Sequence, residues 1–418
     1  MRGGGFGLHG RQEAPSRRLA ILRPICDEFR TGRRGAPVAS ITPFPLIELS
    51  GSPEARGRAY GAAAADRVRR SLAHYGAQLA ESGQDAAGIR ALARAFGPRI
   101  EAFAPHFVPE MRGIAAGANV EFEDIVLVNC RTEILQLAKR QAAEALAAAE
   151  RRNPDGCTGA IILPGATRDG VLVHGQNWDW KSECAETGVV LRIRRDDGPD
   201  ILTFVEAGGL ARCGMNSAGI AITANYLTSD RDYRQQGVPL SLLRRKALEQ
   251  EQLALALQAI YATPKSASNN LMVSQADGFG IDIECAPDES FLLHPEDGIL
   301  VHANHWQSPV ALSKLKDMGI ATTPDSLYRD QRVRQALEAK RGRLDMEALR
   351  EALFDDWQSP WSVCRPPRMN LGGNLSATVA MILMQPVLGV MEIAPLPALN
   401  RQFTRYTLGG GTARLAAE

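Results

Sequence analysis

The sequence predicts an α+β fold in which a mainly helical part is followed by a strand-rich part. Residues 52–152 show helical periodicity and have an Ala-rich end. The pattern changes at NPDG, residues 153–156, after which short apolar runs are separated by turn-forming residues. Helical segments then return between strands that hairpins connect. This order of elements is typical of sheets and helices stacked in layers.

The first ordered element is expected near Ile41, where ITPFPLIELSG reads as a strand that ends at Gly51. Ser52 is suited to cap the helix that follows, because its hydroxyl can accept a hydrogen bond from a free backbone N–H of the first turn. The next helices are interrupted by prolines and a glycine between residues 97 and 109. Residues 41–156 are therefore predicted to be a mainly helical segment.

Residues 157–418 are predicted to hold the sheets. A helix pair is expected at 239–262, a further helical stretch at 324–355, and a hairpin turn at Asp277-Gly278. The expected strands and hairpins, each built from short apolar runs, lie at 157–164, 171–180, 188–195, 201–207, 215–227, 269–287, 298–306 and 377–395.

The two ends of the chain carry weaker signals. Residues 1–36 contain eight Arg, no Lys and three acidic residues. We expect residues 1–40 to be a disordered leader, although an Arg-rich, acid-poor start is also typical of a transit peptide or of an arm that binds nucleic acid. The Gly run at 409–411 predicts a loose tail.

Composition argues against several classes of protein. The 418 residues are 45% hydrophobic and 23% charged, an ordinary globular composition. A net charge of +1 argues against a nucleic-acid partner, and the lack of an 18-residue apolar run argues against a membrane partner. The seven Cys include no CxxC pair, which argues against a disulfide framework or a zinc ribbon. Since no secretion signal is visible, we expect a reduced, cytoplasmic location.

Gly156-Cys157 is the pair of residues with the clearest chemical meaning, since it lies where helix gives way to strand. Glycine tolerates the strained backbone in which a thiol attacks the carbonyl that precedes it. The attack would leave Cys157 at the start of a new chain, with an α-amine whose reference pKa is about 7.7–8.0. Such an amine is suited to take the thiol proton near neutral pH. Taken alone, a cysteine at a strand start is more often only a core residue.

A set of short motifs in a fixed order accompanies this cysteine. After it come GQNWDW at 175–180, then EAG, GMNSAGIAI, GVPLSLL, HANH and SPWSVCR; before it stand GSPEARGRAYG at 51–61 and NCRTEI at 129–134. The chain resembles the acyl-coenzyme A:isopenicillin N acyltransferase family. Members of that family are N-terminal-nucleophile (Ntn) hydrolases that cleave themselves before a cysteine. The resemblance runs from Ile41 to Pro395.

The resemblance implies a four-layer αββα sandwich of the Ntn hydrolase type. It implies cleavage between Gly156 and Cys157 into an α-chain of 156 residues and a β-chain of the remaining 262, which stay together as a heterodimer. It also implies hydrolysis of a small amide, or transfer of its acyl group, through an acyl-thioester on Cys157. No cofactor is implied.

Four further residues are identified through the resemblance. Asp179, in GQNWD, matches an aspartate near the nucleophile and would orient the new amine or hold the cysteine strand; the alternative is an aspartate that closes a turn. Asn304, in HANH, matches an asparagine whose amide donates to the oxyanion, and otherwise would only end a strand. Asn225 is a weaker candidate for a polar contact to substrate. Arg365 would bind a substrate carboxylate or form a surface ion pair.

Two other signals limit the chemistry. The penicillin enzymes of the family carry an arginine where this chain has LSAT at 375–378, which weakens a prediction of penicillin chemistry. His302 and His305 form H-x-x-H, but on a strand such residues face opposite sides and no third ligand is near in sequence. No metal site is therefore predicted.

Three functions stay open at this point. The first is a self-processing cysteine amidohydrolase or acyltransferase that acts on a small linear amide, with water or an amine as acceptor. The second is an acyl-CoA-dependent N-acyltransferase of secondary metabolism, although the sequence shows no dedicated CoA-binding motif. The third is a catalytically silent scaffold of the same fold. Substrate identity and higher oligomeric state are not predicted.

Overall fold

The computed structural model describes residues 41–81, 83–145, 156–370, 375–409 and 412–414. The predicted leader at residues 1–40 lies outside this set, as do the residues just before Gly156. Ile41–Glu418 forms one compact unit.

One of the two sheets has eight strands, in the order β1-β4-β5-β6-β7-β8-β9-β10. Its first strand comes from the N-terminal part of the chain and pairs in parallel with β4, while the other neighbours are antiparallel. The strands are β1 (Leu46–Leu49), β4 (Gly188–Ile193), β5 (Ile201–Glu206), β6 (Cys213–Asn216), β7 (Ile220–Tyr226), β8 (Asn269–Gln275), β9 (Phe279–Cys285) and β10 (Ser290–Leu293).

The second sheet has the order β11-β2-β3-β13-β14-β15-β16, with the short β12 paired beside β13. The strand that begins with Cys157 is β2, which lies between β11 and β3 and is therefore an interior strand. The strands are β2 (Cys157–Ile162), β3 (Val173–Lys181), β11 (Ile299–His302), β12 (Arg368–Met369), β13 (Leu375–Gln385), β14 (Val390–Pro395), β15 (Thr404–Thr407) and β16 (Thr412–Arg414).

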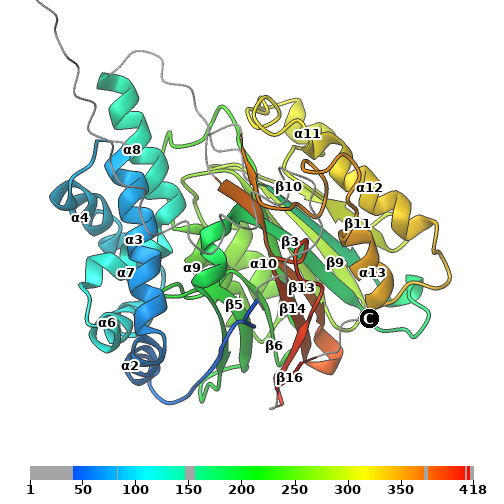
Figure 1. Cartoon of the computed structure of the whole chain (residues 1–418), viewed down its shortest axis with the longest axis horizontal. Helices are drawn as coiled ribbons and strands as arrows, with labels where there is room; N and C mark the ends of the chain where they lie inside the picture. The colour runs from blue at the N-terminus through cyan, green and yellow to red at the C-terminus, as the bar shows by residue number, and fades with distance from the viewer. Residues whose placement is uncertain (1–40, 82, 146–155, 371–374, 410–411, 415–418) are drawn as a thin grey trace, which may run out of the picture. The chain divides into compact units, whose positions relative to one another are not determined.

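The two sheets pack face to face, with helices on both outer sides (Figure 1). Trp178 of β3 and Phe204 of β5 meet between the sheets, with ring centroids 5.6 Å apart. Strands β2, β3 and β13 are almost entirely buried, because neighbours cover both of their faces. Strands β2 and β13 are mostly apolar, and the polar side chains of His174, Gln176 and Asn177 on β3 form hydrogen bonds inside the protein. This is the αββα sandwich that the resemblance implies, so the predicted fold class is confirmed.

The helices fall into two groups along the chain (Figure 1). In the first group, α9 packs on β6 and β7; in the second, α12 and α13 pack on the sheet that holds β2. The first group is α2 (Pro53–Ala63), α3 (Ala65–Glu81), α4 (Ala86–Arg94), α5 (Gly97–Phe103), α6 (Phe107–Ala118), α7 (Phe122–Asn129), α8 (Arg131–Ala145), α9 (Leu240–Leu248) and α10 (Leu253–Tyr261). The second is α11 (Pro309–Leu312), α12 (Ser326–Glu338) and α13 (Met346–Leu353).

Close packing of α2 on α6 organises the N-terminal helices. Ser52 caps α2 as predicted, because its Oγ accepts a backbone N–H of the first turn at 3.3 Å. Gly57 and Gly61 of α2 lie directly against the main chain of α6. Gly113 and Gly117 of α6 lie against the main chain of α2 in the same way. A Cβ at any of the four positions would overlap the facing backbone, so only glycine allows this approach.

The predicted helical part and the predicted strand-rich part share one core. Strand β1 belongs to the helical part of the sequence but completes the sheet on the β4 side. Arg131 of α8 lies 2.7 Å from Glu206 of β5, and Glu110 of α6 lies 3.0 Å from Arg245 of α9. Both ion pairs are buried. A chain cut between the two parts would therefore leave two interlocked fragments.

The structure differs from the sequence prediction at several elements, among them β10 and α11, which were not predicted. The strand expected at 298–306 ends at His302, and a loop follows that carries residues 303–308. In the tail, where a loose segment was predicted, β15 and β16 extend the sheet beyond β14. Backbone pairing defines these two short strands, so they leave little apolar pattern in the sequence.

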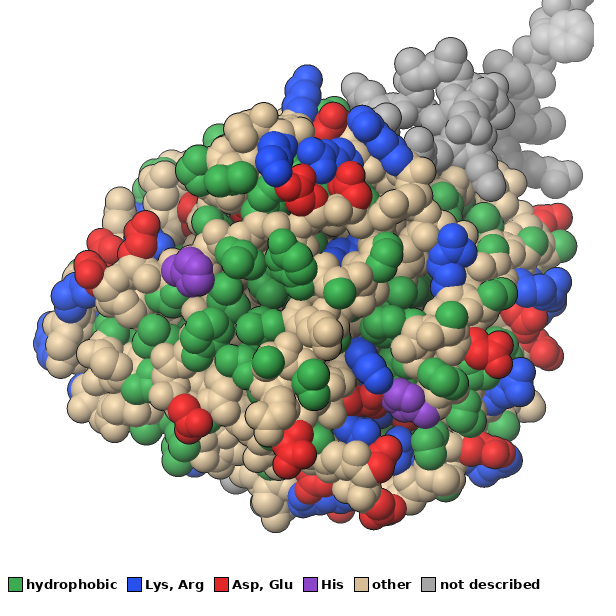
Figure 2. Space-filling view, turned by 180° about the vertical axis from the view of Figure 1, so that it is seen from behind, with side chains coloured by type: hydrophobic (Ala, Val, Ile, Leu, Met, Phe, Trp, Pro, Cys, Tyr) green, Lys and Arg blue, Asp and Glu red, His purple; other side chains and the backbone are tan. Residues whose placement is uncertain are grey.

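Charges of both signs are interspersed around the margin of the face seen in Figure 2, and hydrophobic side chains gather toward its middle. This even mixture agrees with the small net charge of +1. Within the described ranges, none of the helices has the length and apolar character that a membrane-spanning helix requires.

Candidate active site

Cys157 lies at a cavity where the ends of β2, β3 and β7 meet helices α8 and α9. The cavity encloses about 550 Å³ of space, part of it open to solvent. The cysteine itself is only 4% exposed. The titratable side chains that line the cavity are those of Arg131, Glu133, Cys157, Asp179, Arg212, Tyr226 and Arg244.

The peptide bond between Gly156 and Cys157 is held from both sides. The carbonyl oxygen of Gly156 accepts a hydrogen bond from the backbone N–H of Asp179 at 2.9 Å. The backbone N–H of Cys157 donates to Oδ1 of Asn304 at 2.6 Å. One donor thus polarises the carbonyl, while one acceptor holds the nitrogen.

Residue 156 must be small for this arrangement to form. A Cβ at Gly156 would lie 3.0 Å from both Arg329 Nη2 and Asn304 Oδ1, and 3.1 Å from Arg365 Nη1. These distances are shorter than ordinary van der Waals contact. Gly156 therefore allows polar side chains to approach the bond that precedes the cysteine.

Asn304 stands on the loop after β11, and three hydrogen bonds fix its orientation. Its Nδ2 donates to the carbonyl oxygen of Tyr226 at 2.8 Å, and its backbone N–H donates to Ser326 Oγ at 2.7 Å. Its Oδ1 also accepts from Arg329 Nη2 at 2.9 Å. The amide oxygen therefore faces Cys157, while the amide nitrogen points to β7.

Asp179 lies on β3, next to the nucleophile strand, and its carboxylate is buried. Oδ1 accepts a hydrogen bond from Thr378 Oγ1 at 2.7 Å, and Oδ2 lies 3.2 Å from Arg365 Nε. Burial raises the pKa of Asp179, although Arg365 and Arg329 favour its charged form. It is thus the backbone of Asp179 that contacts Gly156, while the side chain is anchored to β13 and Arg365.

Arg365 is fully buried and does not line the cavity. Its guanidinium contacts Asp179 and also forms an ion pair with Asp325. Burial would raise the pKa of Asp325, but Arg365 and Arg329 hold it below its usual value. The sequence left open a substrate contact or a surface ion pair for Arg365, and the structure instead places it in a buried ion pair behind the site.

Asn225 lies on β7, fully buried, between two residues that line the cavity. Its Nδ2 donates to the carbonyl oxygen of His302 at 3.0 Å, and its Oδ1 accepts from Gln176 Nε2 at 2.6 Å. Asn225 itself is not part of the cavity wall. Both ends of the amide are used to hold β3 and β11 in place.

Arg329 of α12 is a site residue that sequence reasoning did not identify. Its Nη1 donates to the carbonyl oxygen of Cys157 and to Thr158 Oγ1, each at 2.7 Å. Its Nε donates to Asp325 at 2.8 Å. The spacing of Asp325 and Arg329 on one helix face predicts an ion pair, but nothing in the sequence indicates that their partner is the cysteine strand.

Arg212 dominates the electrostatics around the thiol. Burial raises the pKa of Cys157, and the positive charge of Arg212 offsets part of this rise. The guanidinium of Arg212 lies over the ring of Trp178, with 4.0 Å between Cζ and the ring centroid. A resting thiol at this position is therefore largely protonated, and a base is needed to activate it.

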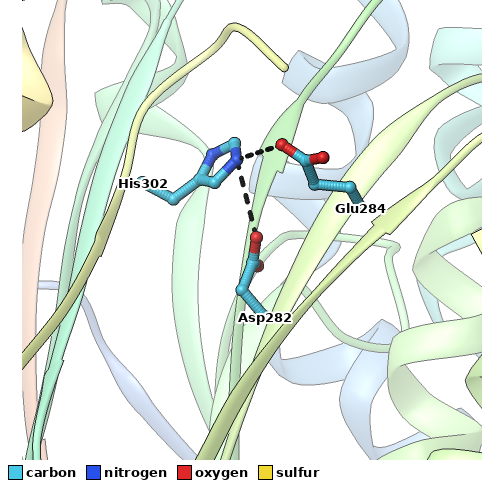
Figure 3. Close-up of side chains that lie close together, drawn as sticks. All are labelled: Asp282, Glu284 and His302. Atoms are coloured by element: carbon cyan, nitrogen blue, oxygen red, sulfur yellow. Dashed lines mark hydrogen bonds and ion pairs between the residues drawn. The ribbon is translucent and has the colours of Figure 1, made fainter. Parts of the chain in front are cut away.

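A second buried cluster supports the loop that carries Asn304 (Figure 3). His302 Nε2 lies 2.9 Å from Glu284 Oε1 and 3.5 Å from Asp282 Oδ2. Both oxygens of Glu284 accept backbone N–H groups, from Gln307 at 2.6 Å and from Ser308 at 3.1 Å. The cluster thus ties β9 and β11 to residues 303–308.

The same cluster offers three ligand atoms within 4.8 Å of one another. Burial lowers the pKa of His302, but Asp282 and Glu284 outweigh this effect and raise it to about 9. A protonated imidazole that donates to a carboxylate has no lone pair at that nitrogen for a metal. As the structure has them, these three residues form a buried ion-pair cluster that positions the loop.

The αββα sandwich, with a buried cysteine at the head of an interior strand and beside a polar cavity, defines the Ntn hydrolase class. The chain belongs to the acyl-coenzyme A:6-aminopenicillanic acid acyl-transferase family, whose sequence profile matches residues 166–394. The match begins after Cys157, so the assignment to the family does not depend on the cysteine itself.

Two relatives illustrate how far the similarity extends. The chain is 31% identical over 270 residues to the 40 kDa form of acyl-coenzyme A:6-aminopenicillanic-acid-acyltransferase from Emericella nidulans. The aligned part covers 62% of this chain and 67% of the Emericella protein. It is 22% identical over 345 residues to an uncharacterized protein of Archaeoglobus fulgidus, covering 74% of this chain. The aligned part spans 57% of the archaeal protein.

Solved structures with a similar arrangement are more distant. A variant of conjugated bile acid hydrolase from Clostridium perfringens is 13% identical to this chain, with a TM-score of 0.44. The superposed part covers 63% of this chain and 97% of the hydrolase chain. Penicillin V acylase from Agrobacterium tumefaciens is 14% identical to this chain, with a TM-score of 0.41. The superposed part covers 60% of this chain and 92% of the acylase chain. The class therefore rests on the family match and on the observed sheets.

Proposed function

We propose that the chain cleaves itself between Gly156 and Cys157, and that the mature Cys157 then hydrolyses a small amide or transfers its acyl group. The observation that carries this proposal is the pair of hydrogen bonds on the Gly156–Cys157 peptide: Asp179 N–H on the carbonyl oxygen at 2.9 Å and Asn304 Oδ1 on the nitrogen at 2.6 Å.

Cleavage would proceed by an N-to-S acyl shift. The thiol of Cys157 attacks the carbonyl carbon of Gly156, so that a C–S bond forms and the C–N bond breaks. The thiol proton passes to the departing nitrogen, which becomes the α-amine. Water then hydrolyses the thioester, which releases the carboxyl group of Gly156 and the free thiol. The N–H of Asp179 is placed to stabilise the negative oxygen of the tetrahedral intermediate.

Turnover of substrate would repeat this chemistry with a second carbonyl in the place of Gly156. The α-amine takes the thiol proton, the thiolate attacks the amide, and the amine of the substrate leaves with a proton. Water or an acceptor amine then takes the acyl group from sulfur. Asn304 Oδ1 would orient the α-amine, and Arg329 would hold Asn304 and the cysteine strand.

Asn304 has two possible roles in this scheme. The resemblance predicts that its amide donates to the oxyanion, and this stays a prediction. The hydrogen bonds described above support the amine-orienting role instead, because Nδ2 is occupied by Tyr226 O and Oδ1 faces Cys157. We assign the oxyanion donor to the backbone of Asp179.

The partners follow from the same proposal. The cleaved α-chain would remain as a heterodimer partner, held by β1 in the sheet and by the buried Glu110–Arg245 ion pair.

The family match favours a second candidate function, transfer of an acyl group from an acyl-CoA donor to an amine. We also propose a cytoplasmic location, which the six free cysteines of the described residues support.

Detection of the acyl-thioester on Cys157 tests whether the proposed turnover takes place. The processed protein is mixed for seconds with an activated amide such as an acyl-p-nitroanilide, then quenched in acid for intact mass measurement. We expect the β-chain to gain the mass of the acyl group, and peptide mapping to place it on Cys157. Cys285→Ser is a matched control, because Cys285 is buried on β9 away from the cavity, and it should acylate like the wild type. Release of p-nitroaniline with no adduct at Cys157 would count against the mechanism.

A further inference from the structure

The cavity beside Cys157 contains more positive than negative charge. Arg131, Arg212 and Arg244 line it, and the same three line a smaller cavity that adjoins it. Arg131 is neutralised, because it lies 2.7 Å from Glu206 and donates to Tyr75 Oη at 2.7 Å. The other two arginines have no such partner among the described residues.

Arg244 lies on α9 and is only 7% exposed. Within the described part of the chain, its guanidinium makes no hydrogen bond or ion pair, and its Nε is buried without an acceptor. A buried guanidinium without an acceptor is unfavourable, and burial together with Arg212 and Arg131 lowers the pKa of Arg244 to about 9. A feature that costs stability beside a nucleophile indicates a use in binding.

Arg212 is in the same situation. Its guanidinium stacks on Trp178 at 4.0 Å and, among the described residues, forms no hydrogen bond. Two acids line the cavity: Asp179 pairs with Arg365, and Glu133 does not form a direct ion pair with Arg212 or Arg244. The Oε1 of Glu133 is occupied by the backbone N–H of Leu240 at 2.9 Å, and burial raises the pKa of Glu133. The two arginines therefore face the cavity with their hydrogen-bond capacity unused.

We propose that Arg212 and Arg244 bind a carboxylate of the substrate, so that the enzyme prefers amides that carry a free carboxylate over neutral amides of the same size. This inference rests on the proposed function, because it places the carboxylate beside the acylated thiol. The guanidinium group presents paired N–H donors that match the two oxygens of a carboxylate. The carboxylate could belong to the acyl part or to the amine part of the amide, and the experiment separates the two.

The test compares matched substrates on the processed protein. Glutaryl-p-nitroanilide against pentanoyl-p-nitroanilide places the carboxylate on the acyl side, and N-hexanoylglycine against its methylamide places it on the amine side. We expect kcat/KM to favour the acidic member of one pair by about tenfold or more, the factor that one charge-assisted hydrogen bond supplies. Equal kcat/KM for both members of both pairs would overturn the inference.

Variants identify the residues responsible. Arg244→Gln and Arg212→Gln should each reduce the acid-to-neutral ratio by about tenfold, and Arg244→Lys should keep part of it. Arg234→Gln is the matched control, because Arg234 is an exposed surface arginine and should leave the ratio unchanged. A ratio that Arg244→Gln does not alter would also overturn the inference.

A binding measurement separates this inference from the proposed function. Glutarate should raise the melting temperature of the wild type, pentanamide should not, and Arg244→Gln should abolish the glutarate effect. Glutarate binding without turnover of any amide would leave the carboxylate site in place and refute the catalytic proposal. Turnover without glutarate binding or acid preference would refute the carboxylate site alone.

Discussion

The amide oxygen of Asn304 lies 2.6 Å from the backbone nitrogen of Cys157, across 147 residues of sequence. Arg329 donates to the same oxygen at 2.9 Å and to the carbonyl oxygen of Cys157 at 2.7 Å. The nitrogen that would become the α-amine therefore has its acceptor in place before any cleavage. The uncleaved chain and the mature enzyme would use the same contact.

Replacing Asn304 should separate its two candidate roles. Asn304→Ala removes the acceptor, and we expect self-cleavage to slow by about tenfold to a hundredfold, the loss of one hydrogen bond to a reacting group. Asn304→Asp keeps an oxygen that faces Cys157 and Arg329 but has no N–H donor. It should therefore cleave faster than Asn304→Ala. Band intensities on a denaturing gel over time give both rates, and equal rates for the two variants would support the oxyanion role instead.

Gly156→Ala should slow self-cleavage while the fold is retained. The new Cβ would lie 3.0 Å from Asn304 Oδ1 and from Arg329 Nη2, so these groups must move away from the scissile bond. Gly76→Ala is the matched control, because Gly76 lies in α3 with open space around its Cβ position. This control should cleave normally and gain about 0.5–1 kcal/mol of stability. Normal cleavage in Gly156→Ala would contradict the argument from close approach.

Arg365→Met should lower the stability of the protein and should lower its activity toward all substrates by the same factor. It removes the ion pair of the buried Asp179, and leaves Asp325 with Arg329 as its ion-pair partner. Such a loss costs about 3–5 kcal/mol of unfolding free energy. Because Arg365 does not line the cavity, kcat/KM for acidic and neutral amides should fall by the same factor. A selective loss with acidic amides would show a substrate contact.

The ion pair of His302 should make stability depend on pH above neutrality. Burial opposes the charge of His302, but Asp282 and Glu284 raise its pKa from 6.5 to about 9. A raised pKa in the folded state contributes stability that is fully present below pH 6.5 and is lost as pH rises toward 9. We expect the difference in melting temperature between wild type and His302→Gln to shrink from pH 7 to pH 9.5. A constant difference across this range would mean that His302 is neutral in the folded protein.

The sequence predicted the parts of the site that carry a local motif. Gly156, Cys157, Asp179 and Asn304 stand in short sequence motifs, and the structure places all four around one peptide bond. The layered fold was predictable because the change from helical to strand periodicity is abrupt at residues 153–156. The change of periodicity predicts the layers, while the family resemblance that the ordered motifs carry identifies Asp179 and Asn304.

The partners of the site could not be predicted in the same way. Arg329 contacts Cys157 across 172 residues, and Arg244 lies on a helix whose sequence reads as an ordinary amphipathic one. Arg365 was expected at the substrate or at the surface, because the motif SVCR gives no sign that this arginine pairs with two aspartates. Long-range pairing of charges is set by the sheet topology, which single-sequence patterns do not contain.

Self-cleavage is the central claim, and intact mass tests it most directly. Wild type and Cys157→Ala are purified in parallel and measured under denaturing conditions. We predict one chain of 45.2 kDa for the variant, and for the wild type two fragments of 156 and 262 residues, the larger one beginning with Cys157. Two fragments from both proteins, or a single uncleaved chain from both, would contradict the assignment of Cys157 as a self-processing nucleophile.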